Sequence, residues 1–254
     1  MKLMKVVINN QLVEYRDEGS GDVLLLLHGW GMDLTTFDQL TTQLKKKFRV
    51  IRFDFPGFGQ SPNPIDDWSV NDYACLTRDI LKKLMVGRLY AVVGHSFGGR
   101  VIIKGVSEGL ISPEKVALIG TAGVKPRQRI KKMSFKAIAK SGKFITSIPV
   151  VRKLQPSLRS YLYGVAGSSD YLADVKMQRI FKNVIEEDLL PEVSNIIQPT
   201  LLLWGETDTE TPLADSQLLL KALPHGRLVV IKDAGHFVYL EAYNKVIKEL
   251  DNFL

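Results

Sequence analysis

The decisive stretch of this sequence reads Leu89-Tyr90-Ala91-Val92-Val93-Gly94-His95-Ser96-Phe97-Gly98-Gly99. It begins as a continuous apolar run, which is typical of a parallel strand buried on both faces. It continues as Gly-x-Ser-x-Gly and then takes on helical spacing. A tight turn from strand to helix exposes a serine hydroxyl, and flanking glycines relieve the steric crowding around it. The stretch therefore predicts that Ser96 is a nucleophile presented at the end of a buried strand.

On both sides of this motif, short apolar runs alternate with longer, helically spaced stretches. The predicted strands are 5–8, 12–16, 23–27, 49–53, 89–93, 115–119, 200–204 and 228–231, and the predicted helices are 34–47, 70–85, 98–109, 213–222 and 240–253. Such alternation predicts an α/β fold, a mostly parallel twisted sheet of about eight strands flanked by helices. Asn9 and Asn10 predict a hairpin turn between the first two strands, and Asp33 and Ser69 predict helix caps.

One segment breaks the alternation. About 80 residues with helical spacing separate strand 115–119 from strand 200–204, which is too long for a simple crossover. The segment is interpreted as a helical cap inserted over the strand ends. The chain then divides into a first part of the core at 1–124, a cap at 125–195 and a second part of the core at 196–254.

The composition is that of an ordinary globular protein. The 254 residues are 45% hydrophobic and 24% charged, which fits one α/β domain with an insertion. The longest apolar run is too short for a membrane span, and the N-terminus lacks the pattern of a secretory signal. Cys75 is the only cysteine, so an intramolecular disulfide is excluded and a reducing compartment is favoured. We therefore expect a cytoplasmic protein.

Positive charge is concentrated in one segment. The formal net charge is +7, yet residues 115–169 contain twelve Lys or Arg and no Asp or Glu, so the rest of the chain is net acidic. This distribution, without a recognised binding motif, argues against nucleic acid as the partner. The sequence has neither metal-ligand spacing nor a phosphate-binding glycine loop. We expect no metal and no cofactor.

Five motifs together resemble the α/β-hydrolases over essentially the whole chain. They are His28-Gly29-Trp30-Gly31, Asp54-Phe55-Pro56-Gly57-Phe58-Gly59, Gly94-His95-Ser96-Phe97-Gly98-Gly99, Gly205-Glu206-Thr207-Asp208 and Ala234-Gly235-His236-Phe237. They occur in the order of that family, in which serine, acid and histidine follow one another along the chain. The resemblance implies an α/β-hydrolase core with a helical cap.

The resemblance assigns the general base to His236, in a loop just after the last apolar strand. A neutral imidazole can take a serine proton near physiological pH and return it to the leaving group. His28 and His95 are expected to pack around the site, and His225 falls in a polar turn. Asp208 is the expected carboxylate that orients the imidazole.

Other acidic residues near the predicted site receive structural interpretations. Glu206, Glu210 and Asp233 are predicted to be solvated loop charges, and Asp54 is predicted to shape its loop. No carboxylate follows strand 115–119, so an acid at that position is excluded.

The resemblance also implies two backbone donors for a developing oxyanion, the amides of Trp30 and Phe97. The loop at 28–31 lacks the longer glycine run that some hydrolases carry. Substrate contacts are expected from Trp30, Phe97, His28 and Phe237.

The predicted activity is hydrolysis of a carboxylic ester of a small or medium acyl substrate through an acyl-enzyme. The alternatives are cleavage of a C–C bond, a thioester or a methyl ester held on a carrier protein, and a non-catalytic ligand-binding member of the fold. The basic cap is interpreted as an amphipathic helical layer, or as a docking surface for an acidic partner such as an acyl carrier protein or an anionic surface.

Overall fold

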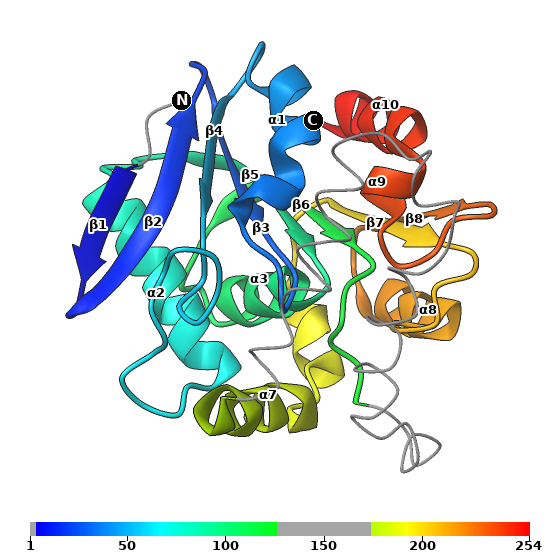
Figure 1. The fold of residues 1–254 in the computed structure, drawn as a ribbon. Helices are drawn as coiled ribbons and strands as arrows, with labels where there is room; N and C mark the ends of the chain where they lie inside the picture. Colours follow the sequence, from blue (N-terminus) through cyan, green and yellow to red (C-terminus); the bar gives the residue numbers. More distant parts are fainter. Residues whose placement is uncertain (1–3, 126–173) are drawn as a thin grey trace, which may run out of the picture.

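Eight strands form one sheet in the computed structural model, which describes residues 4–125 and 174–254 (Figure 1). The strands are β1 (Met4–Ile8), β2 (Gln11–Glu18), β3 (Val23–Leu27), β4 (Arg49–Phe53), β5 (Leu89–His95), β6 (Pro113–Ile119), β7 (Thr200–Gly205) and β8 (Gly226–Ile231). Their order across the sheet is β1-β2-β4-β3-β5-β6-β7-β8. The β1–β2 and β2–β4 pairs are antiparallel and the others are parallel. The predicted mostly parallel sheet is confirmed.

Helices cover both faces of the sheet. They are η1 (Leu34–Phe37), α1 (Asp38–Leu44), α2 (Val70–Lys83), α3 (Phe97–Ser107), α7 (Val175–Glu186), η3 (Leu190–Asn195), α8 (Leu213–Ala222), α9 (Val238–Glu241) and α10 (Tyr243–Phe253). One face is covered by α1, α9 and α10, and the other by α2, α3 and α8 (Figure 1).

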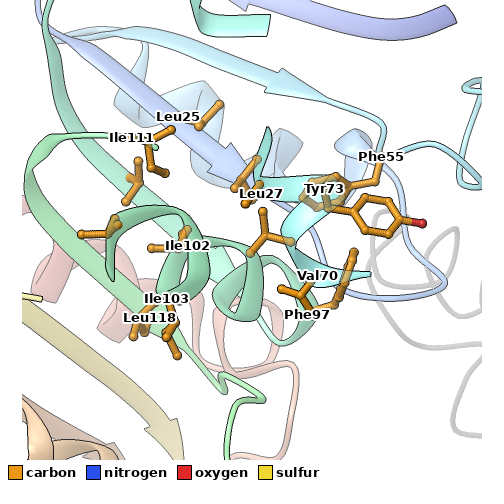
Figure 2. Close-up of a cluster of buried hydrophobic side chains, with 14 of the residues drawn as sticks. Leu25, Leu27, Phe55, Val70, Tyr73, Phe97, Ile102, Ile103, Ile111 and Leu118 are labelled. Carbon is orange, nitrogen blue, oxygen red and sulfur yellow. The ribbon is translucent and has the colours of Figure 1, made fainter. Parts of the chain in front are cut away.

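The central strand β3 shows how the sequence specifies two cores. Leu24 and Leu26 pack into the apolar cluster beneath α1, α9 and α10, whereas Leu25 and Leu27 pack into the cluster beneath α2 and α3. Successive side chains of a strand point to opposite faces, so a continuous leucine run fills both layers. Figure 2 shows part of the second cluster, with Leu25 on the side of Ile111 and Leu27 toward the ring of Tyr73. Complete burial of each leucine contributes about 1.5–3 kcal/mol.

The predicted turn and cap residues are confirmed. Asn9 and Asn10 have φ values of +48° and +66° in the tight turn between β1 and β2. The Asp33 carboxylate accepts from the Thr35 amide at the start of η1. Ser69 forms a reciprocal capping box with a carboxylate three residues later at the start of α2.

Two predicted helices are interrupted. The helix expected at 34–47 is a 3₁₀ turn followed by α1, because the Asp54 carboxylate accepts the Leu34 amide at 2.7 Å and fixes that first turn. The helix expected at 240–253 is broken at Ala242, whose φ of −128° and ψ of +42° are not helical. The Glu241 carboxylate just before the break turns back to the amides of Gly235 and Phe237.

Most of the predicted cap, residues 126–173, lies outside the described residues, so the boundaries at 125 and 195 stay a prediction. The described end of that segment is α7, which packs on the loop after β4. Arg179 Nε lies 2.6 Å from Asp67 Oδ2, and Lys176 Nζ donates to the Pro64 carbonyl at 2.9 Å. Lys104 of α3 forms ion pairs with Glu187 and Glu192 in the chain that leads back to the core, at 2.8 and 2.5 Å. These contacts hold α7 beside the carboxyl ends of the strands.

Candidate active site

A sharp turn joins β5 to α3, and Ser96 is the single residue between them. Its φ of +49° and ψ of −110° form a backbone conformation that L residues rarely adopt. The Ser96 amide donates to the Ile119 carbonyl at 3.0 Å, and the Ser96 carbonyl accepts from the Gly99 amide at 3.0 Å. Strained backbone persists where the surroundings fix it, and it concentrates at functional sites. Ser96 is therefore a functional candidate on geometry as well as on sequence.

Gly94 and Gly98 let this turn close against the sheet. A Cβ on Gly98 would lie 2.1 Å from the Leu27 carbonyl oxygen, and a Cβ on Gly94 would lie 2.8 Å from the Gly98 carbonyl oxygen. These obstacles are backbone atoms, which cannot move aside as the end of a flexible side chain can. The close approach explains why glycine stands on each side of Ser96.

A carboxylate and an imidazole meet after the neighbouring parallel strands β7 and β8. His236 Nδ1 lies 2.9 Å from Asp208 Oδ2, and the two side chains are only 6% and 0% exposed. A carboxylate accepts, so Nδ1 carries the hydrogen in the neutral ring and Nε2 keeps the free lone pair. The two residues that the sequence analysis paired are therefore in hydrogen-bond contact.

Both oxygens of Asp208 are occupied. Oδ1 accepts from the amides of Glu210 and Thr211, each at 2.9 Å, and Oδ2 accepts from the Thr211 hydroxyl at 2.8 Å as well as from His236. Burial alone would raise the pKa of Asp208, but the His236 hydrogen bond and charge, together with the Thr211 donors, lower it below its usual value. Asp208 is thus held ionised in one orientation.

Acidic groups surround His236. Burial alone would lower the pKa of this imidazole, but the hydrogen bond to Asp208 and the negative charges of Glu210, Asp208 and Glu241 raise it above its usual value. The Glu241 carboxylate also accepts from the Gly235 amide at 2.6 Å and from the Phe237 amide at 3.2 Å. It therefore fixes the backbone on both sides of the histidine.

The carboxyl end of β6 brings the serine turn close to this pair. Gly120 follows β6, and a Cβ there would lie 3.3 Å from Asp208 Oδ2 and 3.4 Å from His236 Nδ1. The residue before it, Ile119, accepts the Ser96 amide. The His95 ring, next to Ser96 in sequence, lies 4.7 Å from the His236 ring between centroids. The three predicted residues thus gather at one edge of the sheet.

The loop after β3 reaches the same edge. His28 is 1% exposed; its Nε2 accepts from the Phe55 amide at 3.0 Å, and its Nδ1 donates to the Gly29 carbonyl at 2.8 Å. Burial lowers the pKa of His28 to about 4, so the ring is neutral. The geometry gives His28 a role in joining two loops, and its expected contact with substrate stays a prediction.

Asp54 makes a second connection between these loops. Its carboxylate accepts from the amides of Leu34 and Gln60, at 2.7 and 2.8 Å. Burial raises the pKa of Asp54 to about 6, against the lowering effect of those two hydrogen bonds. This placement fits the loop-shaping role predicted from the sequence.

Comparison with known proteins agrees with the fold and the motifs. A model of the alpha/beta hydrolase family matches residues 24–249, which is most of the chain. The chain belongs to the alpha/beta hydrolase family. The resemblance predicted from the five motifs is therefore confirmed, and membership of this family makes the protein a hydrolase.

Relatives of this hydrolase act on different substrates. It is 26% identical over 243 residues to a pimeloyl-[acyl-carrier protein] methyl ester esterase of Nitrosomonas europaea, covering 87% of this chain and 91% of the relative. It is 22% identical to a 2-hydroxy-6-oxononadienedioate/2-hydroxy-6-oxononatrienedioate hydrolase of Escherichia coli, covering 92% and 89%. The enol-lactonase from Burkholderia xenovorans LB400 superposes with a TM-score of 0.78 at 20% identity, covering 98% and 99% of the two chains. This last likeness supports the fold alone.

Aromatic side chains stand beside the serine turn of this alpha/beta hydrolase. The Trp30 ring lies 4.8 Å from Phe58, 5.2 Å from Phe97 and 5.0 Å from Phe181 of α7, between centroids. The Phe237 ring lies 5.2 Å from the His236 ring between centroids. Three of the predicted substrate contacts, Trp30, Phe97 and Phe237, are thus placed near Ser96 or His236.

Sequence reasoning missed three neighbours of the site. Thr211 binds Asp208, Phe181 packs on Trp30, and Glu210 approaches His236 although it was predicted to be only a solvated charge. Pro212 and the acidic stretch 206–210 indicated a loop, but nothing in the sequence indicated which side chains of this loop contact Asp208 or His236. Within residues 4–125 and 174–254, no group of three or more His, Cys, Asp or Glu is arranged to hold a metal. In the same ranges, no helix has the length and apolar character of a membrane span.

Proposed function

We propose that this hydrolase cleaves a carboxylic ester of a small or medium acyl group through an acyl-enzyme intermediate. Ser96 is the nucleophile, His236 is the general base and Asp208 orients the imidazole. The observation that carries the proposal is the 2.9 Å contact between His236 Nδ1 and Asp208 Oδ2 at the sheet edge that also bears the strained Ser96 turn. Unrelated serine hydrolases use the same three roles.

The proposed reaction proceeds in two similar halves. Ser96 Oγ attacks the ester carbonyl while His236 Nε2 takes its proton, and the carbonyl electrons move onto oxygen. When the tetrahedral intermediate collapses, the alcohol leaves with the proton from Nε2 and the acyl group stays on Ser96. Water then repeats the attack with His236 again as base, which releases the acid and restores the serine. Ionised Asp208 stabilises the imidazolium in both halves.

The proposed oxyanion donors are the amides of Trp30 and Phe97. Phe97 is the first residue of α3, so its amide is among those that a helix leaves without an intrahelical partner. Within the described parts of the chain, no hydrogen bond runs from the Trp30 amide to another residue. In hydrolases, loss of one such donor costs about 3 kcal/mol of transition-state stabilisation.

Aromatic rings support an apolar acyl site. Trp30, Phe58, Phe97 and Phe181 pack edge to face or tilted against one another next to the serine turn. Apolar surface favours hydrocarbon chains, whose burial contributes about 0.8 kcal/mol per CH₂ group.

A panel of p-nitrophenyl esters of increasing chain length tests the function. We expect a burst of p-nitrophenol equal to the enzyme concentration, followed by steady turnover that is fastest for small or medium acyl chains. A wild-type enzyme that leaves every ester intact but cleaves a vinylogous diketone would contradict ester hydrolysis and favour C–C bond cleavage. An enzyme inert toward esters, thioesters and diketones would favour a non-catalytic role.

An acidic carrier protein is the proposed source of the acyl ester. Two features support it: the basic segment 115–169, and the 26% identical relative that is a methyl ester esterase acting on an acyl-carrier protein. Opposite charges speed association and select partners. We expect acyl carrier protein to co-elute with the enzyme at low salt and to lose this binding when Lys131, Lys132 and Lys136 are changed to glutamate. If the wild-type enzyme and the triple glutamate variant cleave carrier-bound esters with equal kinetics, docking of the carrier on this segment is contradicted.

Thr211 is expected to position the acid. Its hydroxyl lies 2.8 Å from Asp208 Oδ2 and 3.1 Å from the Gly120 carbonyl oxygen, and its side chain is buried. Thr211→Val keeps the shape but removes the donor, so we expect kcat to fall about tenfold, in line with one hydrogen bond to a charged group. Thr211→Ser should restore most of the rate. A Val variant with wild-type kcat and an unchanged pH profile would refute this role.

A further inference from the structure

Glu210 approaches the nitrogen of His236 that the proposed mechanism uses. Its Oε2 lies 3.6 Å from His236 Nε2, on the opposite side of the ring from Asp208. Its backbone is fixed, because its amide donates to Asp208 Oδ1 at 2.9 Å. The imidazole is thus flanked by one carboxylate on each nitrogen.

The reacting bond must come close to the same nitrogen. Proton transfer from Ser96 requires Oγ within about 3 Å of His236 Nε2. The ester carbonyl that Oγ attacks must therefore lie within a few ångströms of the Glu210 carboxylate. The Glu210 side chain is 61% exposed, which lets it stay hydrated next to the reacting groups. In the parts of the chain that the structure describes, His236 is its only ion-pair partner.

Within the described residues, the other carboxylates beside the imidazole are engaged: both Glu241 oxygens accept from the amides of Gly235 and Phe237. Trp30, Phe97 and Phe237 contribute rings, and the Asp208 carboxylate is fully buried behind the imidazole. A charged part of a substrate beside the bond cleaved therefore meets Glu210, the exposed carboxylate on the Nε2 side of His236. Like charges a few ångströms apart repel, and the repulsion weakens with hydration and salt.

We propose that Glu210 makes this site select esters that are neutral or cationic beside the bond cleaved, and disfavour esters that carry a carboxylate there. The inference rests on the proposed function and narrows its substrate class. Cleavage of a neutral ester creates a carboxylate at this position, so the same repulsion favours release of the acid product.

Two esters with the same acyl group test the proposal: neutral o-nitrophenyl butyrate and anionic 3-butanoyloxy-4-nitrobenzoate, which differ only by a carboxylate on the leaving group that cannot reach the ester carbonyl. We expect Glu210→Gln to lower the ratio of kcat/KM values, neutral over anionic, about fivefold, within the range measured for exposed charge pairs. Any effect transmitted through the basicity of His236 acts on both esters and cancels in the ratio. Glu206→Gln is the matched control, since Glu206 lies on the same loop and accepts from the Asp233 amide.

Added salt provides a second measurement. The ratio of the wild-type enzyme should fall toward that of Glu210→Gln as ionic strength rises, whereas the ratio of the variant should stay nearly constant. An unchanged ratio in Glu210→Gln, or an equal fall in Glu206→Gln, would overturn the selection by charge and leave the proposed function intact. A wild-type enzyme that cleaves neither ester would overturn the function and the inference together.

Discussion

Replacing Ser96 with alanine is expected to lower kcat for ester hydrolysis by about 10⁴-fold or more. The acyl group has no other attachment point in the proposed mechanism, so the remaining rate comes from binding and from the oxyanion donors alone. KM for the same ester should rise toward the dissociation constant, because the acyl-enzyme that accumulates during the burst lowers KM in the wild type and cannot form in the variant. Steady-state kinetics with p-nitrophenyl butyrate measure both quantities.

A control separates this chemical effect from loss of structure. Ser194→Ala alters an exposed hydroxyl on η3, whose only described hydrogen bond is a 3.4 Å contact with the Pro191 carbonyl, and it should keep the wild-type rate. The Ser96→Ala protein should unfold near the wild-type temperature. Rapid turnover by a correctly folded Ser96→Ala variant would contradict the assignment of Ser96 as the nucleophile.

The second large effect is expected from Asp208→Asn, which should lower kcat by roughly 10³- to 10⁴-fold. The change keeps the side-chain volume but offers His236 an amide in place of a carboxylate. If the amide donates to Nδ1, the ring hydrogen moves to Nε2 and the proton acceptor that Ser96 needs is lost. A variant that retains more than a tenth of the wild-type kcat would contradict the assigned orienting role.

The same substitution should move the pH profile in a defined direction. His236 must be neutral to accept a proton, and its pKa is raised above the ordinary value of 6.5, so the acidic limb of kcat/KM should lie above pH 6.5 in the wild type. Asp208→Asn removes a group that raises this pKa and leaves the burial that lowers it. The limb should therefore move to lower pH, and a limb that stays in place would contradict the coupling.

The sequence predicted those parts of the fold in which a residue pattern is compatible with only one local structure. The run at β3 is apolar at every position because the strand is covered on both faces, and the glycines around Ser96 are required by the backbone of β3 and α3. The order of the five motifs then predicted which loops meet, because the carboxyl ends of parallel strands lie at one edge.

The contacts of loop side chains could not be predicted in the same way. Thr211 and Glu210 both follow β7. Thr211 is buried against Asp208, whereas Glu210 approaches Nε2 of His236. Their directions depend on the path of the loop, which no periodic pattern encodes. Phe181 meets Trp30 because α7 packs on the core through Met177, Ile180 and Val184 and on the loop after β4 through Arg179 and Lys176. Such long-range packing between a helix and distant loops leaves no signal in local spacing.

The nucleophile is tested most directly by the site of covalent labelling. The wild-type protein is incubated with a fluorophosphonate, digested and sequenced by mass spectrometry, alongside the Ser96→Ala and His236→Ala variants. We predict one phosphonyl group per chain on the Ser96 peptide, no label in the Ser96→Ala protein and much slower labelling in the His236→Ala protein. A phosphonyl group on another residue, or ester turnover by a protein that the reagent does not label, would contradict the central claim.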